Sequence, residues 1–168
     1  MTLKLRKTMQ HSRAFTLIEL MITLAILAIL LAIAAPSFRD TIQNNRTQTI
    51  ANDLTTALQF ARSEAVKRGV RVDICRRAAN ACADAVDWGN GWLVKVNGGD
   101  VLRVWEAVGD RDTVSGPNET LTYRPNGLLT KTTDSAFTVA FDNCTGKPQY
   151  TIALTATGRV TSTKGTCP

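Results

Sequence analysis

The sequence predicts an α+β fold in which one long N-terminal helix leads into a domain of antiparallel strands. Three observations predict it: an apolar run at residues 15–35, a single apolar stripe at residues 50–65, and alternating strand patterns after Gly69. A helix that is apolar all round in one half and on one face in the other needs two environments. We therefore expect lipid or the core of a fibre around the first half, and a sheet against the second.

The apolar run covers 21 residues and contains one charged side chain, Glu19. At about 1.5 Å per residue such a helix spans the hydrocarbon core of a bilayer, roughly 30 Å. The residues before it carry four positive charges and no negative one, which predicts that this end stays in the cytoplasm; they are Lys4, Arg6, Lys7 and Arg13. A carboxylate within such a segment is costly in lipid, so Glu19 is a candidate functional residue.

Three interpretations of this segment compete. A cleaved secretory signal has a shorter apolar core that ends in a small-x-small site. Residues 32–34 imitate that site, but the run is long and Glu19 lies inside it. A plain membrane anchor explains the length of the run and gives the glutamate no role. The third interpretation is a resemblance to a known family.

The basic leader, the small residue Ala14 and the segment Phe-Thr-Leu-Ile-Glu-Leu at 15–20 resemble the class III signal of type IV pilins and type II secretion pseudopilins. The resemblance implies that prepilin peptidase cuts between Ala14 and Phe15, and that the new amino group of Phe15 is methylated. Gly is usual before the cut in this family, so Ala14 departs from the pattern. The resemblance also implies that the Glu19 carboxylate pairs with the N-terminal amine of a neighbouring subunit during assembly. The alternative for Glu19 is an acid of the first helical turn that reaches the membrane surface.

Removal of the leader changes which chemistry the chain can perform. The net charge of +6 becomes 16 − 14 = +2, because the leader holds 4 of the 20 basic residues and no acid. The only histidine, His11, also lies in the leader, so the mature chain has no imidazole base or ligand. Two acid pairs, Asp84 with Asp87 and Asp110 with Asp112, are expected in loops, and no phosphate-binding or zinc motif occurs. We expect a protein that is not an enzyme and binds no cofactor or metal.

Four cysteines, Cys75, Cys82, Cys144 and Cys167, lie beyond the apolar run. An even number outside the cytoplasm predicts two disulfides, for which three connectivities exist. Local pairing of Cys75 with Cys82 and of Cys144 with Cys167 is expected, because each pair spans one hairpin or terminal return. Free buried thiols are the alternative.

The helix is expected to run from Phe15 to Arg68, with a kink at Pro36. Gly69, after two basic residues, ends it. The stripe at three- and four-residue steps consists of Ile50, Leu54, Ala57, Leu58, Ala61 and Ala65. The chain thus divides into a cleaved leader (1–14), a transmembrane and assembly half of the helix (15–35), an amphipathic half (36–69) and a β-rich head (70–168).

Strands are expected at residues 70–74, 92–96, 101–105, 120–123, 136–141, 150–154 and 159–161, with a hairpin turn at 97–100. The three tryptophans Trp88, Trp92 and Trp105 are expected in the core or at the edge of a sheet.

Short motifs in this half narrow the resemblance to the group of pseudopilin H and the minor pilins T and U (GspH/FimT). They are ARSEAVKRG at 61–69, GWLV at 91–94, YRPNG at 123–127 and GRV at 158–160. The resemblance implies a type IV pilin-like fold and a low-abundance subunit that initiates assembly or sits at the fibre tip. Implied partners are the other minor pilins or pseudopilins, the major pilin and the assembly platform of the inner membrane, with the head in the periplasm.

Two other functions stay open. One is capture of duplex DNA, since some T-type members carry Gly-Arg-x-Arg near the C-terminus. Here Gly158, Arg159 and Val160 match, and Thr161 replaces the second Arg. Lys147, Arg159 and Lys164 lie in an acid-free stretch, 143–168, that forms either a phosphate-binding surface or a solvated rim. The other function is that of a type II secretion pseudopilin that contacts exoproteins.

Overall fold

The computed structural model describes residues 15–168, except for the side chains of residues 34–37. Residues 1–14, and with them the leader and the Ala14 side of the expected cleavage site, lie outside this range. The described chain falls into two units that meet between Asp40 and Thr41.

One helix, α1 (Leu17–Arg68), belongs to both units. Between Leu17 and Ile33 its described side chains are exposed on every face. Its most apolar stretch has a mean hydropathy of 2.8, and by length and composition α1 can cross a membrane. Pro36 lies among the residues whose side chains are not described, and the kink expected there stays a prediction.

From residue 47 onward α1 supplies one wall of a core. All six residues of the predicted stripe are buried, and Thr47 and Ala51 are buried beside them. The helix ends as expected, with Lys67 and Arg68 in its last turn and Gly69 at φ +66°, a conformation that favours glycine.

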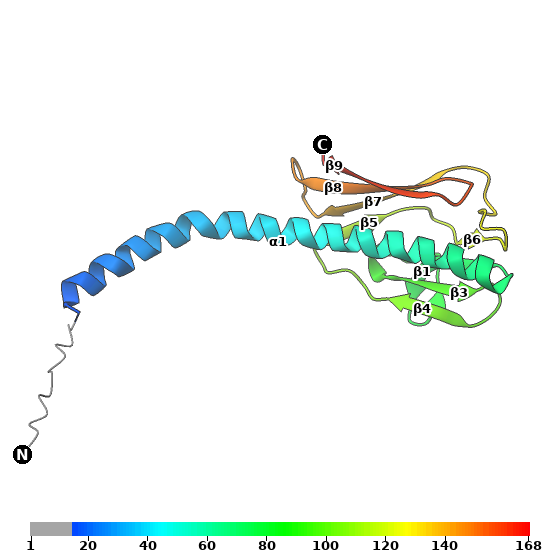
Figure 1. Ribbon diagram of the computed structural model, residues 1–168, viewed down its shortest axis with the longest axis horizontal. Helices are drawn as coiled ribbons and strands as arrows, with labels where there is room; N and C mark the ends of the chain where they lie inside the picture. The colour runs from blue at the N-terminus through cyan, green and yellow to red at the C-terminus, as the bar shows by residue number, and fades with distance from the viewer. Residues whose placement is uncertain (1–14) are drawn as a thin grey trace, which may run out of the picture. The chain divides into compact units, whose positions relative to one another are not determined.

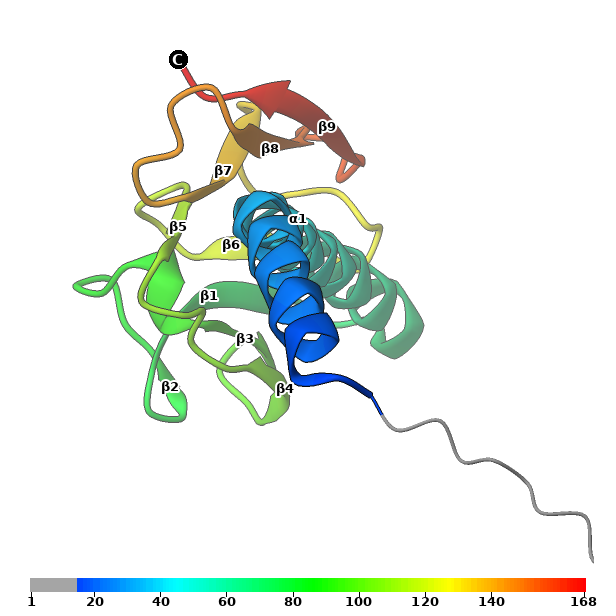
Figure 2. The same cartoon turned by 90° about the vertical axis from the view of Figure 1, so that its left-hand side faces the viewer.

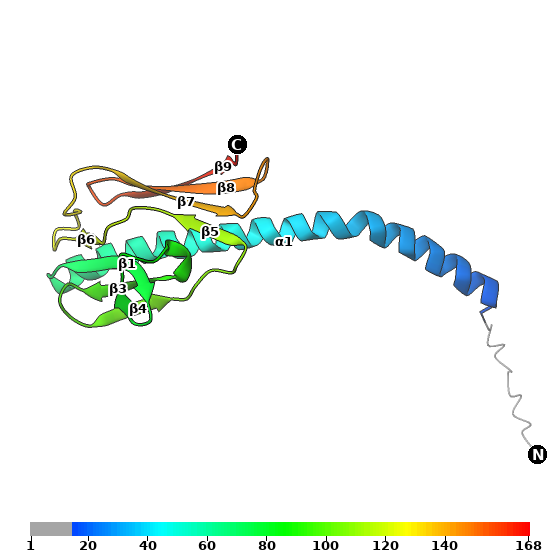
Figure 3. The ribbon, with the colours of Figure 1, turned by 180° about the vertical axis from the view of Figure 1, so that it is seen from behind.

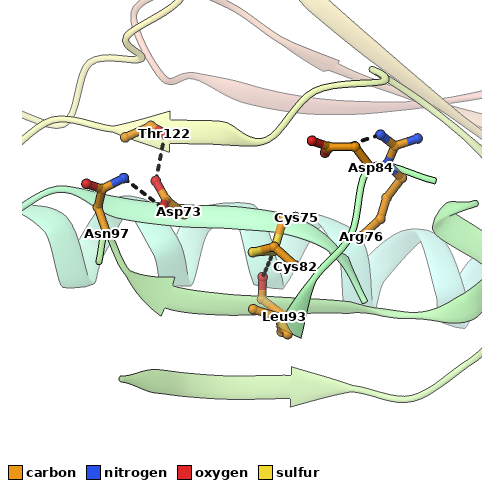
Figure 4. The surroundings of a disulfide bond; sticks show 8 residues. All are labelled: Asp73, Cys75, Arg76, Cys82, Asp84, Leu93, Asn97 and Thr122. Carbon is orange, nitrogen blue, oxygen red and sulfur yellow. Dashed lines mark hydrogen bonds and ion pairs between the residues drawn. A yellow bond between two sulfur atoms is a disulfide. The ribbon is translucent and has the colours of Figure 1, made fainter. Parts of the chain in front are cut away.

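The first sheet contains β1 (Val72–Ala78), β2 (Ala81–Cys82), β3 (Trp92–Val96), β4 (Val101–Trp105) and β6 (Leu121–Tyr123). Its order is β2-β1-β3-β4, and β6 also pairs with β1; every pair is antiparallel. Figure 4 shows how Asp73 of β1 joins its neighbours, accepting from Asn97 (2.9 Å) and from Thr122 (2.7 Å). A short 3-10 helix, η1 (Trp88–Asn90), precedes β3.

The second sheet contains β5 (Asp112–Ser115), β7 (Ser135–Phe141), β8 (Pro148–Leu154) and β9 (Val160–Thr166), in that order and all antiparallel. Figures 1 and 3, and the end-on view of Figure 2, show the head part of α1 between this layer and the layer of β1, β3 and β4. Both sheets and the helix share one hydrophobic core, in which Trp92, Tyr123 and Phe137 are the largest fully buried side chains.

The structure corrects several expected strands. The first begins at Val72 and continues to Ala78, and the last runs from Val160 to Thr166 instead of ending at 161. Both β2 and β5 were missed, and Trp88 lies in the 3-10 helix. The three tryptophans are core residues, as expected.

Candidate functional site

Between Leu17 and Ile33 of α1, Glu19 is the one charged residue. The backbone N–H of Glu19 donates to the Thr16 hydroxyl (3.3 Å), so Thr16 caps the helix and Glu19 lies in its first turn. The spacing Thr-x-x-Glu is that of a capping box. The Glu19 side chain is exposed, and at this end the helix dipole favours a negative charge. Such a group can bind an amine or another cation.

Both disulfides form within the head, and they have the expected local pairing. Cys75 of β1 pairs with Cys82 of β2, with 5.5 Å between their Cα atoms (Figure 4). Cys144, in the β7–β8 loop, pairs with Cys167 after β9, with a Cα separation of 5.8 Å. The second bridge fastens the C-terminal end of β9.

The three basic residues that were candidates for DNA contact do not gather at one place. The β8–β9 register pairs Leu154 with Val160 and Pro148 with Thr166, so Arg159 and Lys147 lie at opposite ends of this hairpin. Lys147 donates to the Gln43 amide oxygen (3.0 Å) and lies over the Phe141 ring. Arg159 and Lys164 are exposed.

Arg159 instead lines a groove with two basic residues of α1, Arg62 and Lys67. The groove has a volume of about 680 Å³ and lies between the last turns of α1 and the Gly158–Val160 turn. Sequence reasoning did not single out Arg62 or Lys67 as site residues. In the sequence these two residues stand out only as part of the 61–69 motif, which resembles the GspH/FimT group.

Arg62 also links three of the sequence motifs in space, namely those at 61–69, 123–127 and 158–160. Its guanidinium donates to the carbonyls of Gly127 (3.1 Å) and Thr157 (3.3 Å), and thereby joins the helix to two turns. In the second of these turns Gly158 has φ +78°, and a Cβ atom there would lie 2.3 Å from the Gly127 carbonyl oxygen. Gly158 is therefore required by the fold, and Arg159 is the residue of that motif that is exposed.

An ion pair with one buried partner lies elsewhere in the head. Arg46 of α1 is 2.7 Å from the carboxylate of Asp112, whose side chain is fully buried at the start of β5. Asp112 was expected in a loop, so its position is a correction. Burial raises the pKa of Asp112, and the Arg46 charge opposes this only in part. Near the groove, a hydrogen bond from Arg68 holds the pKa of Glu64 below its ordinary value.

Among residues 15–168 no three His, Cys, Asp or Glu side chains are grouped so as to hold a metal ion. The paired acids of the sequence do not form such a group either.

Two families match the sequence. Residues 51–158 match the family described as type II transport protein GspH, and residues 9–35 match the prokaryotic N-terminal methylation motif. No curated protein matches the chain at a significant level.

Solved structures resemble the fold. The type IV minor pilin FimU of Pseudomonas aeruginosa superposes with a TM-score of 0.57 at 25% identity, covering 74% of this chain and 90% of FimU. A second crystal form of FimU gives a TM-score of 0.54, also at 25% identity, over 69% of this chain and 91% of FimU. The minor pseudopilin EpsH of the Vibrio cholerae type 2 secretion system gives 0.51 at 9% identity, over 70% of this chain and 96% of EpsH, which supports the fold alone. The fold of this chain is therefore that of type IV minor pilins and minor pseudopilins.

Proposed function

Because the chain belongs to the GspH family of type II transport proteins, we propose that it is a minor pilin or pseudopilin that joins other low-abundance subunits to initiate or cap a periplasmic filament. One observation carries the proposal. A single helix, α1, has an apolar half with one carboxylate at its start, and its other half supplies one wall of the core of a folded head. One helix thus suits both membrane insertion and helix bundling, and it keeps the head on the periplasmic side of the membrane.

The chain reaches this state through processing at its N-terminus. The methylation motif at residues 9–35 implies a prepilin peptidase, for which we propose cleavage between Ala14 and Phe15 followed by methylation of Phe15. Before assembly, the subunit is anchored in the inner membrane with its head in the periplasm. Its partners are the other minor subunits, the major subunit and the assembly platform.

Glu19 gives assembly its register. An unpaired carboxylate in an apolar bundle is costly, and the cost disappears when the N-terminal amine of a neighbouring Phe15 pairs with it. Docking one helical turn out of register leaves both charges unpaired. The Glu19 carboxylate therefore selects one position of a subunit along the helix bundle.

The test compares Glu19→Ala and Glu19→Gln with a matched change on the polar part of α1, Asp53→Ala, in cells that assemble the filament. Cleavage is followed by N-terminal mass, and incorporation by the amount of protein in sheared filaments. We expect both Glu19 variants to be cleaved and left in the membrane, and Asp53→Ala to assemble. Normal incorporation of Glu19→Gln would refute the proposed role.

We further propose that the chain belongs to a type IV pilus and not to a type II secretion system. The 25% identity with FimU favours a type IV pilus, whereas EpsH at 9% identity adds only the fold. The alternative is a type II secretion pseudopilin that contacts exoproteins. Deletion of the gene separates the two, because loss of surface pili with normal protein secretion indicates the pilus branch.

The alternative function for the head is weak, salt-sensitive binding of duplex DNA. Arg159 and Lys67 are exposed near the same groove, so a phosphate can meet two cations there. Titration of the protein with duplex DNA at two salt concentrations, with Arg159→Gln as the matched variant, tests it. Absence of binding at low salt excludes this function.

A further inference from the structure

The outer strand of the second sheet has an unusually complete free edge. β9 pairs with β8 alone, over seven consecutive residues and without a register shift. Six of its seven residues are exposed. Proteins prevent such edges from pairing with other chains by short strands, bulges, prolines or charges. Two other outer strands follow that rule, since β5 has four residues and β4 pairs with β3 through a register shift. β9 has one lysine, Lys164, and no other such feature.

The hydrogen bonds at the two ends of the strand identify which backbone groups are free. Cys167 N–H donates to the Lys147 carbonyl (2.9 Å), and Thr155 N–H donates to the Arg159 carbonyl (3.0 Å). Bonding alternates along an antiparallel ladder, so Thr161, Thr163 and Gly165 bond to β8. The N–H and C=O groups of the remaining positions point away from β8, where the described residues place no strand; these positions are Val160, Ser162, Lys164 and Thr166.

This edge is fixed at both ends before any partner arrives. The Cys144–Cys167 disulfide holds the C-terminal end. At the other end the Arg159 N–H donates to the Thr155 hydroxyl (3.2 Å), and the Gly158 backbone packs closely against the Gly127 carbonyl. A strand that is already ordered adds little entropy cost to binding, because only the partner has to be ordered.

The charges around the edge indicate the chemistry of the partner. Residues 143–168 contain no acid, and two exposed cations lie at this strand: Arg159 directly before β9 and Lys164 within it. The groove beside Arg159 adds Lys67 and the exposed apolar side chain of Val66. Glu64 of α1 is buried and is paired with Arg68, and Lys67 lies 3.9 Å from its other carboxylate oxygen.

We propose that the outer edge of β9 receives an extended acidic segment of a partner protein as an added strand, with an aliphatic side chain of that segment in the groove beside Val66. Main-chain bonds to Ser162 and Lys164 supply the affinity, and the cations supply the selectivity. A second copy of the chain fits poorly, because antiparallel pairing of two β9 edges brings their cations together. Duplex DNA fits poorly as well, since Arg62 already donates to two carbonyls and few cations are left for phosphates.

Photo-crosslinking in filament-forming cells tests this proposal on the full chain. Benzoylphenylalanine is placed at Thr161 or at Thr163, and the crosslinked segment is mapped by mass spectrometry. We expect both positions to meet one acidic segment of one partner protein, at residues two apart, as in a paired strand. An adduct with a second copy, with DNA or with a segment that lacks acids, or no adduct at all, would overturn the proposal.

Two matched pairs of variants separate strand pairing from general effects. Ser162→Pro removes an outward N–H and leaves the β8 ladder complete, so it should lower the crosslink yield by roughly ten-fold, the equivalent of one lost hydrogen bond. Ser162→Ala keeps the N–H and should retain the yield. Lys164→Glu should lower the yield as well, whereas the same charge change at exposed Arg71 should not. An adduct that resists both Ser162→Pro and Lys164→Glu would overturn the proposal, even where the proline variant is unstable. The edge is separate from Glu19, so this test and the assembly test can fail independently.

Discussion

The Arg46 guanidinium lies 2.7 Å from the carboxylate of Asp112, and this ion pair joins α1 to the first strand of the second sheet. The two partners differ in exposure, with side-chain values of 53% for Arg46 and 0% for Asp112. Among the described residues neither oxygen of Asp112 has a hydrogen-bond partner. The pair therefore depends on charge alone, and the desolvation of Asp112 opposes it.

Removing the arginine should destabilise the head strongly. Arg46→Gln leaves a buried carboxylate without compensation, which costs about 3 kcal/mol at neutral pH. Adding Asp112→Asn to that variant should recover most of the loss, because no buried charge remains. Urea unfolding of the head, Thr41–Pro168, is a suitable measurement, since this unit contains the whole core. Arg71→Gln, at an exposed arginine, is the control and should change stability by less than about 0.5 kcal/mol.

The same carboxylate predicts the pH dependence of stability. Because burial raises the pKa of Asp112 above its ordinary value of 3.8, the folded head keeps this proton at a pH where the unfolded chain has lost it. The contribution of Asp112 to stability therefore falls as pH rises from 3.8 through the folded pKa, and the penalty is complete above that. Asp112→Asn should thus gain stability relative to the wild type across this window. A difference that is constant with pH would contradict the assignment.

Gly158 should be one of the positions of the head that tolerate only glycine. An alanine there combines a positive φ with a Cβ atom 2.3 Å from the Gly127 carbonyl oxygen, so backbone has to move. We expect Gly158→Ala to cost at least about 2 kcal/mol. Gly146→Ala is the matched control, since Gly146 has a similar φ of +72° and no atom within 4 Å of its Cβ position. It should cost only about 1 kcal/mol, measured by thermal unfolding. Equal losses would show that the contact with Gly127 is unimportant.

The helix could be predicted from sequence because its signals are local. The stripe from Ile50 to Ala65 repeats at helical spacing, and Gly69 follows two basic residues. Strand β9 was expected too short, because residues 161–166 are Thr, Ser, Lys and Gly with no apolar alternation. An edge strand that buries little does not need that alternation. Strand β5 was missed because its first residue, Asp112, looks like a loop residue until Arg46 is placed beside it.

Some candidate sites could likewise be predicted from local sequence, and others depend on contacts that only the fold creates. Glu19 and the cysteines are recognisable from sequence, because an acid in an apolar run and an even cysteine count are local facts. The groove is not recognisable, since Arg62 reaches carbonyls that lie 65 and 95 residues further along the chain. Lys147 was grouped with Arg159 by sequence proximity, yet the hairpin register separates them.

The Cys144–Cys167 bridge should stabilise the head by restricting the unfolded chain. Its sequence separation of 23 residues corresponds to about 3 kcal/mol in the chain-entropy account. Cys144→Ser and Cys167→Ser should each lose a similar amount, and the double variant should be no worse than either. Urea unfolding of the non-reduced proteins measures this, with the Cys75–Cys82 bridge as an internal control that stays intact. A double variant much less stable than both single ones would indicate that the sulfur atoms act separately.

The cap at Thr16 should matter for assembly through the position of Glu19. The Thr16 hydroxyl accepts the Glu19 N–H, so Thr16→Val removes the acceptor at nearly the same volume and costs about 1 kcal/mol of helix stability at this end. The first turn then frays, and the Glu19 carboxylate loses its fixed place next to the helix start. We expect cleaved Thr16→Val to enter filaments poorly, and Thr16→Ser, which keeps the hydroxyl, to enter them normally. The ratio of filament to membrane protein, counted only for cleaved chains, separates this effect from processing. Equal ratios for the two variants would show that the cap does not position Glu19 for assembly.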